Sequence, residues 1–505
     1  MTRRALFVAT ALLALLIPAT ALAAAPGPKP PLSANGYFFT DASGRAVFMH
    51  GFNMVYKVGS YAPSDFGFGA DDARFLRRHG FNTIRLGLIY KGLEPDPPGP
   101  SGRPAYDVGY LDKIAKTERV LAKHRIFSLL DFHQDMYNER FEGEGWPDWQ
   151  TFDDGQAAEP KNGFPANYLF MQALNTAFDH FWANDPAEGV GLQDRYAMAW
   201  RFVAERFGGN PYVMGYDLMN EPWPGSAWPG CASTTGCPAF DAGPLTDFSN
   251  RTIAAIRDVD DETLVFWEPL LTFDFGAATA HADTGDPSAG FSFHDYCIAG
   301  ALGSVGIPIT ALGVPEGTTC AELEELVFQN AQGVAERTGD VPFLTEFSAT
   351  DDAETNERLV RLADEYMVSW QSWHYCDCDD PTTAGPGIQS LVIDPREPPR
   401  GENVKREKLA LFSRPYPRAV AGTPIGFEFD PESRAFDFAY RTEPVGGGRL
   451  SKRTQTEVFV PPIHYHGDYA VDVEGAKVVS KPGRRVLRLR NARGAKEVRV
   501  RVVPG

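Results

Sequence analysis

Positively charged residues are fewer than negatively charged ones in this sequence. The sequence also lacks the motifs of nucleotide-binding proteins and of repeat proteins. The 48 Lys and Arg residues face 66 Asp and Glu residues, so the formal net charge is -18. Because nucleic-acid binding needs a basic face, nucleic acid is not expected as a partner. No glycine-rich nucleotide loop follows an early apolar run, and no internal repeat is present. Dinucleotide-binding folds and repeat architectures are therefore disfavoured.

Long apolar runs are also missing, except at the N-terminus. Arg3 and Arg4 precede an apolar run over residues 5–17, and the tripeptide Ala-Leu-Ala at 21–23 follows as a cleavage signature. This arrangement predicts a secretory signal peptide over residues 1–23 and a secreted mature protein. The alternative is a retained membrane anchor, although the run is short for a membrane span. No lipid anchor and no later transmembrane helix are expected, because no Cys follows the cleavage site and no later run is long enough.

Cysteine is scarce as well, with six residues in the chain. In an exported protein such residues are expected to form disulfides. They fall into three pairs along the sequence: Cys231 and Cys237, Cys297 and Cys320, and Cys376 and Cys378. The first two pairs bracket loops and are expected to form bridges, whereas the third has an awkward spacing for a mutual bridge. A Cys-x-Cys metal site is the alternative there, but it lacks a second Cys pair or His cluster, so no metal is expected.

Short apolar runs alternate with segments of helical periodicity through most of the chain. Continuous apolar runs of this length are typical of strands that are buried on both faces. The eight runs cover residues 47–55, 83–90, 126–133, 213–221, 263–269, 290–296, 341–349 and 369–375. Segments such as 110–124 and 321–337 lie between them and have helical periodicity. This alternation predicts a (β/α)8 TIM barrel over residues 24–410, with a doubly wound open sheet as the runner-up fold.

The pattern changes after residue 410. A Pro-rich connector at 414–424 leads into short runs with period-two alternation, and helical periodicity disappears. This pattern predicts a small antiparallel β-sandwich domain over residues 411–505. From Gly448 to the C-terminus, 13 Lys and Arg face 5 Asp and Glu, a net charge of +8. The basic tail is compatible with an acidic lipid surface, but a solvated face of the sandwich is the simpler interpretation.

The predicted barrel strands end repeatedly in carboxylate, histidine and aromatic side chains. In a barrel of this kind the active site lies at the C-terminal ends of the strands. In chain order, the residues at these ends are Asn53 and Lys57, Arg85, His133 and Asp135, Asn220 and Glu221, Trp267 and Glu268, His294 and Tyr296, Glu346, and Trp373. We expect this set to converge on one pocket, with Glu268 in a structural role.

Glu221 and Glu346, on the fourth and seventh predicted strands, suit glycoside hydrolysis. One carboxyl protonates the leaving oxygen and the other attacks the anomeric carbon, so the two need different protonation states. Arg85 and Tyr296 are expected to hold Glu346 ionised, while Glu221 stays protonated to higher pH. Trp373 offers a flat apolar face for a sugar ring. Each side chain alone also has a structural explanation, and only their convergence in one barrel favours catalysis.

Several segments resemble glycoside hydrolase family 5, in the clan of retaining barrel-fold glycosidases, and more closely the endoglycoceramidases. The NEP triplet at 220–222 and the glutamate of FLTEFSA are moderately specific, and the HQD triplet together with the RPYP connector is more so. The resemblance covers nearly the whole mature chain. It rests on HGFNMVYK (50–57), GFNTIRLGLIYKGLEP (80–95), DFHQDMY (131–137), GYDLMNEPWPG (215–225), FSFHDYC (291–297), FLTEFSA (343–349) and RPYPRAVAGTP (414–424).

The resemblance implies retaining hydrolysis of the bond between an intact oligosaccharide and ceramide. Glu221 would be the acid/base, Glu346 the nucleophile, and Asn220 the partner of the 2-hydroxyl of the reacting sugar. Lys57, His133, Asp135, Tyr296 and Trp373 would line the first sugar site, supported by Arg85 and His294. The segment WHYCDCDD at 373–380 departs from the more polar, Asn-containing loop expected of the family at this place.

The resemblance also sets expectations about partners. The substrate would be a glycosphingolipid in a membrane or micelle, a detergent or activator requirement is left open, and we expect a monomer. No metal or organic cofactor is implied. Two apolar segments, 297–315 and 270–280, are candidates for a wall that binds ceramide. The alternative is that both pack against the barrel's own helices.

Two other functions stay open at this stage. One is a glucan- or steryl-glucoside-cleaving relative on the same barrel. A polysaccharide cleft would need a row of aromatic platforms, and the candidates are Trp146, Trp149, Trp182, Trp223 and Trp228. The other is a catalytically silent binder of sugar or lipid. A binder has no need of two carboxylates at these strand ends, which argues against it.

Overall fold

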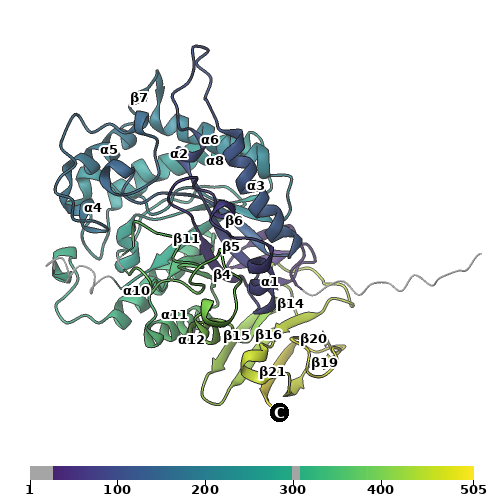
Figure 1. Cartoon of the computed structure of the whole chain (residues 1–505). Coiled ribbons are helices and arrows are strands. Elements are labelled where there is room, and N and C mark those ends of the chain that lie inside the picture. The colour runs from purple at the N-terminus through teal and green to yellow at the C-terminus, as the bar shows by residue number, and fades with distance from the viewer. Residues whose placement is uncertain (1–26, 298–307, 384) are drawn as a thin grey trace, which may run out of the picture.

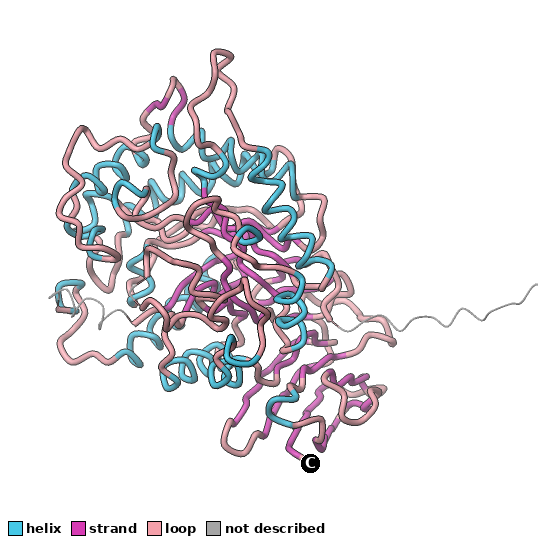
Figure 2. Tube along the Cα trace, viewed as in Figure 1, coloured by secondary structure: helices cyan, strands magenta, loops and turns pink. Residues whose placement is uncertain are grey.

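The computed structural model describes residues 27–297, 308–383 and 385–505, so the predicted signal peptide lies outside the described residues. Strands form the centre of the larger body and helices surround them, whereas the C-terminal part consists mainly of strands (Figures 1 and 2). Within the described part of the chain, no helix combines the length and the apolar character needed to cross a membrane.

The larger body is a closed barrel of eight parallel strands, as predicted. The strands follow one another around the barrel in chain order, and β13 closes it by pairing with β4. Every residue of these strands is buried, which explains why their sequences read as continuous apolar runs. The barrel strands are β4 (His50–Met54), β5 (Thr83–Ile89), β6 (Phe127–His133), β9 (Val213–Asp217), β10 (Leu264–Trp267), β11 (Ala289–Asp295), β12 (Val341–Phe347) and β13 (Ser369–Ser372).

Helices lie between the barrel strands, and the two segments with helical periodicity named above form α3 and α10. The longer helices are α1 (Ala70–Arg78), α3 (Val108–Lys123), α5 (Gln172–Trp182), α6 (Leu192–Phe207), α8 (Thr246–Arg257), α10 (Cys320–Thr338), α11 (Ala353–Glu365) and α12 (Arg406–Phe412). Short helical segments in the loops include α2 (Tyr90–Leu93), α4 (Ala166–Phe170), η6 (Leu271–Phe275), α7 (Pro238–Phe240) and α13 (Pro462–Tyr465), and β7 (Pro186–Ala187) with β8 (Val190–Gly191) forms a small hairpin.

Helix α10 shows how local sequence sets the boundaries of these elements. The Thr319 hydroxyl accepts a hydrogen bond from the Glu322 backbone, and the Glu322 carboxylate accepts one from the Thr319 backbone. This reciprocal capping fixes the start of the helix. At the other end Gly339 adopts a left-handed conformation with φ of 79°, which a residue without a Cβ takes without strain. Thr319 and Gly339 therefore set the two ends of α10.

The C-terminal domain is a pair of antiparallel sheets that share one apolar core, as predicted. The smaller sheet has the order β15-β16-β21-β18, and along β21 alternate residues are buried. The larger sheet has the order β1-β2-β3-β14-β17-β20-β19. The strands are β1 (Leu32–Asn35), β2 (Phe38–Asp41), β3 (Ala46–Val47), β14 (Tyr416–Val420), β15 (Thr423–Asp430), β16 (Ala435–Arg441), β17 (Thr456–Phe459), β18 (Tyr469–Glu474), β19 (Ala476–Val478), β20 (Val486–Asn491) and β21 (Glu497–Pro504).

Strand β14 was not predicted, because Pro417 within it and Pro415 just before it are typical of a connector. All five of its residues are buried, and it pairs with β3 on one side and β17 on the other. Pro417 has no N–H to donate, and the register with β17 shifts between Pro417 and Ala419. Through β14 the N-terminal strands β1 to β3 join the same sheet as the C-terminal strands. The larger sheet thus combines strands from the start of the described chain with β17, β19 and β20 of the C-terminal part.

Candidate active site

Most of the residues predicted at the strand ends converge on one end of the barrel. Trp267 does not, because its ring stacks on His281 and its Nε1 donates to Asp340 Oδ2 at 2.9 Å. Each of the converging residues comes from a strand of the barrel or from the loop directly after it, so the barrel geometry alone brings them together. Arg85 lies on β5, His133 ends β6, Asn220 and Glu221 follow β9, His294 lies on β11 with Tyr296 just beyond it, Glu346 lies on β12, Trp373 follows β13, and Lys57 and Asp135 lie in the loops after β4 and β6.

Arg85 is the centre of this network and is fully buried. Its Nε donates to Asp217 Oδ2 at 2.9 Å and its Nη2 donates to Glu268 Oε1 at 2.7 Å. Nη1 donates to Glu346 Oε1, and Nη2 lies 3.1 Å from Asp131 Oδ1. One guanidinium group therefore contacts four buried carboxyl groups.

Three of those four carboxyl groups were missed or treated as structural by the sequence reasoning. Burial raises the pKa of Asp217 to about 6 against the opposing charge of Arg85, and burial also raises the pKa of Glu268 well above its usual value. Asp131 and Asp217 stand inside apolar runs. A charge in a buried strand requires a buried partner, and this rule could have identified both residues as neighbours of Arg85.

Glu346 is held by Arg85 and by Tyr296, whose hydroxyl donates to Glu346 Oε2 at 3.0 Å. These are the two contacts expected from the sequence. Burial nevertheless raises the pKa of Glu346 above its ordinary value, although the positive charge of Arg85 acts in the opposite direction. The expected contacts are therefore present, but desolvation outweighs their effect on the pKa.

Glu221 is fixed by its backbone as well as by its side chain. It has a φ of 43°, a left-handed conformation unusual for a residue with a Cβ, and its N–H donates to Glu268 Oε2 at 2.8 Å. Its Oε1 lies 2.9 Å from His294 Nδ1. Burial raises the pKa of Glu221 to about 7, and the negative charge of Asp135 adds to this shift. Glu221 is thus suited to carry a proton near neutral pH, as predicted.

His294 bridges the two glutamates. Its Nδ1 lies 2.9 Å from Glu221 Oε1 and 3.8 Å from Glu346 Oε2. The sum of these distances places Glu221 Oε1 and Glu346 Oε2 at most about 6.7 Å apart. The two carboxyl groups are about 5–5.5 Å apart in retaining glycosidases and about 6.5–9.5 Å apart in inverting ones. This limit on one pair of oxygens is compatible with the retaining spacing. Burial lowers the pKa of His294 to about 3, so the ring is neutral between the two glutamates.

Gln134, the middle residue of the HQD triplet, positions the NEP segment. Its Nε2 donates to the backbone carbonyls of Asn220 at 2.9 Å and Glu221 at 3.1 Å. In return, Asn220 Nδ2 donates to the Gln134 carbonyl at 2.9 Å, and Asn220 Oδ1 accepts from Arg85 Nη2 at 3.0 Å. Gln134 was missed as a site residue, although its place in the HQD triplet was a signal.

Lys57, His133 and Asp135 form a second group at the barrel mouth. Lys57 Nζ donates to Asp135 Oδ2 at 2.6 Å and to Thr382 Oγ1 at 2.7 Å. Burial lowers the pKa of His133, but the adjacent Asp131 carboxylate outweighs it and the net pKa is about 10. Lys57 and His133 likewise outweigh burial at Asp135 and hold its pKa below the usual range. The group is therefore charged at neutral pH and offers both donors and acceptors to sugar hydroxyls.

Trp373 lies beside this charged group, as predicted. Its ring stacks on His133 with centroids 5.3 Å apart and planes 17° apart, and Lys57 Nζ is 4.5 Å from the ring centroid. Its Nε1 donates to Gln389 Oε1 at 3.0 Å. The indole is only 5% exposed. The contacts with His133 and Lys57 and the hydrogen bond to Gln389 thus fix the orientation of the indole ring.

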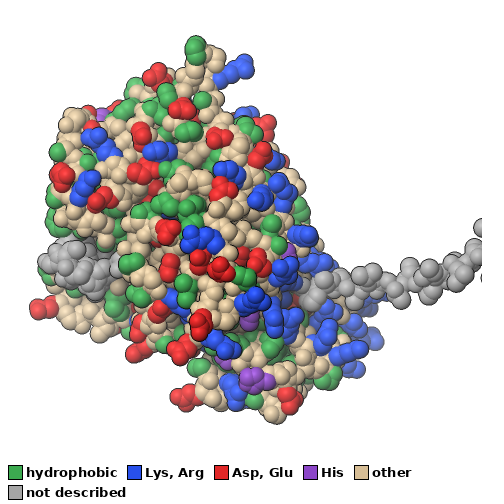
Figure 3. Space-filling view, viewed as in Figure 1, with side chains coloured by type: hydrophobic (Ala, Val, Ile, Leu, Met, Phe, Trp, Pro, Cys, Tyr) green, Lys and Arg blue, Asp and Glu red, His purple; other side chains and the backbone are tan. Residues whose placement is uncertain are grey.

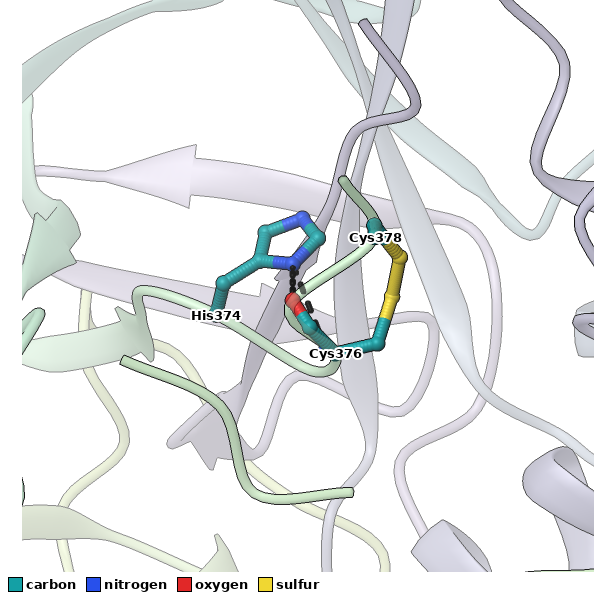
Figure 4. Close-up of side chains that lie close together, drawn as sticks. All are labelled: His374, Cys376 and Cys378. Atoms are coloured by element: carbon teal, nitrogen blue, oxygen red, sulfur yellow. Dashed lines mark hydrogen bonds between the residues drawn. A yellow bond between two sulfur atoms is a disulfide. The ribbon is translucent and has the colours of Figure 1, made fainter. Parts of the chain in front are cut away.

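The loop after Trp373 contains a disulfide that the sequence reasoning did not expect. Cys376 and Cys378 are bonded, with Cα atoms 5.2 Å apart, and Cys378 has a φ of 50° (Figure 4). The left-handed residue turns the chain back on itself, so the two-residue spacing is no obstacle. The bridges between Cys231 and Cys237 and between Cys297 and Cys320 are present as predicted.

His374 supports this loop from inside. Its Nε2 accepts the Val55 N–H at 2.7 Å, so Nδ1 carries the proton and donates to the Cys376 carbonyl at 2.5 Å (Figure 4). Burial lowers the pKa of His374 to about 4, which keeps it neutral. Because both sulfurs are bonded to each other, they are not available as metal ligands. The prediction that the protein needs no metal stays a prediction.

Comparison with known proteins assigns the family. Residues 40–379 match the cellulase model of glycosyl hydrolase family 5, and residues 414–502 match the C-terminal domain of glycoside hydrolase family 5. The chain belongs to glycoside hydrolase family 5. The predicted class of enzyme, a glycoside hydrolase, is thereby confirmed, and the second match covers the predicted β-sandwich.

Relatives of this family 5 chain match it along most of their length. Endoglycoceramidase I of Rhodococcus hoagii (strain 103S) is 34% identical over 464 residues, which cover 90% of this chain and 85% of the relative. Endo-glycoceramidase II from Rhodococcus sp., solved as a ganglioside GM3 complex, has a TM-score of 0.73 at 27% identity, covering 92% of this chain and 98% of that one. Its lactosyl-enzyme intermediate also has a TM-score of 0.73 at 27% identity, with 93% and 99% covered. The resemblance to endoglycoceramidases that the motifs indicated is confirmed.

Proposed function

We propose that this protein is a secreted, retaining endo-β-glycosidase that cleaves the bond between the oligosaccharide and the ceramide of glycosphingolipids. The observation that carries the proposal is the pair Glu221 and Glu346, both within 4 Å of His294 Nδ1 at the mouth of a family 5 barrel. The similarity to endoglycoceramidases over nearly the whole chain supports the substrate class. Secretion rests on the N-terminal sequence alone.

The first step forms a covalent glycosyl-enzyme. A carboxylate oxygen of Glu346 attacks the anomeric carbon, and the bond from that carbon to the glycosidic oxygen breaks. Glu221 gives its proton to that oxygen, so ceramide leaves as a neutral alcohol. Arg85 and Tyr296 keep the attacking carboxylate in place. Because Glu221 has a pKa of about 7, it still holds this proton in a large fraction of molecules at neutral pH.

The second step releases the oligosaccharide. Glu221, now ionised, takes a proton from water, and the resulting oxygen attacks the anomeric carbon from the face that ceramide left. The bond to Glu346 breaks and the carboxylate is regenerated, so the configuration at the anomeric carbon is retained. Asn220 is held by Arg85 Nη2 and by the Gln134 carbonyl, and it would bind the 2-hydroxyl of the reacting sugar. Lys57, His133, Asp135 and Trp373 would hold the other hydroxyls and the ring face.

Two apolar segments were considered as a wall for the ceramide. In the segment 270–280, Leu270, Leu271 and Phe273 are buried, and the last two pack in the barrel core. These three side chains are therefore not available as an open wall for ceramide. The alternative, that the segment packs against the barrel, applies to residues 270–280. Of the other candidate segment, residues 298–307 lie outside the described part of the chain.

The alternative of a polysaccharide-cleaving relative is weakened by the tryptophans. Trp146 is 1% exposed and stacks on Tyr137, and Trp223 is 3% exposed. Trp182 uses its Nε1 to bond the Trp223 carbonyl at 2.7 Å. Trp146 and Trp223 therefore belong to the protein interior, whereas Trp149, Trp182 and Trp228 are half-buried, so the five side chains do not form a row of open platforms.

Product analysis tests the proposal. The purified protein is incubated with a ganglioside, with glucosylceramide and with cello-oligosaccharides, alongside an E346A control. Intact oligosaccharide together with free ceramide is the expected outcome. Cleavage of cello-oligosaccharides or simple glucosides alone would instead support the glucanase or simple-glucosidase alternative. Sequencing the N-terminus of protein recovered from culture medium tests secretion, and a start close to residue 24 is expected.

A further inference from the structure

A large groove lies on the flank of the barrel, away from the catalytic glutamates. It encloses about 1570 Å³ and runs along α1 and α12 to the C-terminal domain. Its walls include the turn after α3, the loop 398–401 and the start of β20. Figure 3 shows Lys and Arg side chains gathered where the barrel meets the C-terminal domain, the side on which α1 and β14 lie in Figure 1.

The lining of this groove is strongly basic, although the protein as a whole carries a formal charge of -18. A single carboxylate, that of Asp71, is among the lining residues. The nine cations that line it are Arg74, Arg77, Arg78, Lys123, Arg125, Arg400, Arg406, Arg418 and Arg485. Such a concentration of one sign in a concave surface focuses the electrostatic field and attracts anions.

Most of these cations have no carboxylate to neutralise them. Apart from Arg77 and Arg125, none of the nine forms an ion pair with a carboxylate among the described residues, within 4.0 Å. Arg418 is the most deeply buried example. It is only 3% exposed, yet its Nε and Nη2 have no hydrogen-bond partner in the described part of the chain. A buried guanidinium with unused donors calls for an anionic partner.

The cations of the groove also repel one another. Burial lowers the pKa of Arg77 to about 9, and the neighbouring charges of Arg418 and Arg125 add to the shift. Helix ends explain only part of the pattern: Arg77, Arg78 and Lys123 lie at the C-termini of α1 and α3, where positive charge is favourable.

Four further cations have no such explanation. Arg406 stands at the first position of α12, where positive charge is unfavourable. Arg400 lies in a loop, and Arg418 and Arg485 belong to the C-terminal domain. An anion in the groove would relieve the mutual repulsion of all of them.

The shape and chemistry of the groove narrow the choice of anion. Its volume exceeds the roughly 300–1,000 Å³ of a typical small-molecule pocket, so an extended chain fits better than a single small ion. Single-stranded nucleic acid would require aromatic platforms. Of the two phenylalanines that line the groove, Phe459 is only 2% exposed and cannot stack a base. A flat membrane would not reach the buried Arg418.

We propose that this groove binds an extended acidic polysaccharide, whose sulfate or carboxylate groups are held by the arginines. Guanidinium groups match the planar geometry of such oxyanions and bind them in a bidentate manner. The site is separate from the catalytic glutamates, and the proposal does not depend on the proposed hydrolysis. It would hold the protein on an acidic glycan while the barrel mouth stays open.

Binding to labelled dextran sulfate, measured by fluorescence anisotropy on the full mature chain, tests the proposal. Labelled neutral dextran is the reference polymer and is expected not to bind. The variant R74Q/R400Q/R406Q removes three exposed cations from both walls of the groove, and we expect its affinity to fall about tenfold or more. The matched variant R201Q/R206Q/R251Q removes three exposed cations from α6 and α8, and we expect its affinity to stay within about twofold.

Several outcomes would overturn the proposal. These are absence of binding by the unmodified protein, unchanged affinity in the groove variant, and equal losses in the two variants. Tighter binding of a single-stranded oligonucleotide, or of anionic vesicles, with loss in the groove variant would assign the surface to those partners and reject the polysaccharide. Hydrolysis of a soluble lactoside is measured in parallel and is expected to be equal in all three proteins, so failure of the catalytic proposal is seen separately.

Discussion

The hydroxyl of Tyr296 donates a 3.0 Å hydrogen bond to Oε2 of Glu346. Burial and the nearby Glu346 charge raise the pKa of Tyr296 well above its usual value, so the phenol keeps its proton and acts only as a donor toward this carboxylate. The bond holds the proposed nucleophile at the orientation from which it attacks. It also shares the carboxylate charge with Arg85 on the opposite oxygen.

Removing this hydroxyl should slow the reaction without unfolding the protein. We expect Y296F to lower kcat about 10²-fold, because a preorganised donor to the reacting carboxylate is lost. The matched variant is Y366F, which removes a hydroxyl bonded to Glu325 at the protein surface. It should keep kcat within about twofold. Equal kcat values for Y296F and the unmodified protein would show that the hydrogen bond plays no part in catalysis.

Replacing Glu346 by alanine should abolish turnover, with a loss of about 10⁴-fold or more. Azide should restore part of the rate on a substrate with a good leaving group, because it fits the space left by the carboxylate and attacks from the same side. The product should then be an α-glycosyl azide. Nuclear magnetic resonance identifies its configuration, and a β-glycosyl azide from this variant would contradict the assignment of Glu346.

The pH profile should show the ionisation of both glutamates. Burial raises the pKa of Glu221 to about 7, and a general acid must carry its proton, so kcat/KM for the glycolipid should fall as pH rises through about 7. Glu346 must be ionised to attack. Because its pKa is raised by burial, activity should be lost on the acid side at higher pH than for an exposed glutamate.

A second substrate separates the two limbs of this profile. An aryl glycoside with a weakly basic leaving group does not need the proton of Glu221 in the first step. Its rate of glycosyl-enzyme formation should therefore fall much less on the basic side. Identical basic limbs for the two substrates would mean that Glu221 is not the group that titrates there.

Arg85 should be essential for stability as well as for catalysis. It is the shared partner of Asp131, Asp217, Glu268 and Glu346, and its removal leaves buried carboxyls without a counter-charge. We expect R85A to lower the free energy of unfolding by about 3–5 kcal/mol. Urea denaturation followed by circular dichroism measures this change.

The control for Arg85 is an exposed ion pair. Arg361 and Glu365 are 55% and 60% exposed, so R361A should change the free energy of unfolding by less than about 1 kcal/mol. Losses of similar size in R85A and R361A would contradict the account of Arg85 as the buried centre of the site.

Much of this architecture was predictable because the barrel imposes a simple sequence pattern. Each strand is buried on both faces, so it reads as a continuous apolar run, and the residues after each run lie at one end of the barrel. That is why Glu221 and Glu346, 125 positions apart in the chain, could be placed in one pocket before the structure was known. The local sequence pattern did not predict elements that depend on long-range contacts. An example is β14, which pairs with β3 and places Val420 opposite Ala46.

Charge networks were the other feature that the sequence left undefined. Arg85 was predicted to contact Glu346, but its bonds to Asp217 and Glu268 depend on side-chain directions inside the barrel. The net pKa of each group is a balance between desolvation and several neighbours, and no spacing rule yields that balance. The Cys376–Cys378 bridge was unexpected for a similar reason, since it depends on the left-handed backbone at Cys378.

The most direct test of the central claim is to trap the covalent intermediate. The protein is incubated with a 2-deoxy-2-fluoro glycoside carrying an activated leaving group, digested with a protease, and analysed by mass spectrometry. The account predicts a stable glycosyl adduct on the peptide that contains Glu346, with fragmentation assigning the added mass to that residue. An adduct on Glu221, or none on a protein that still hydrolyses the parent glycoside, would contradict it.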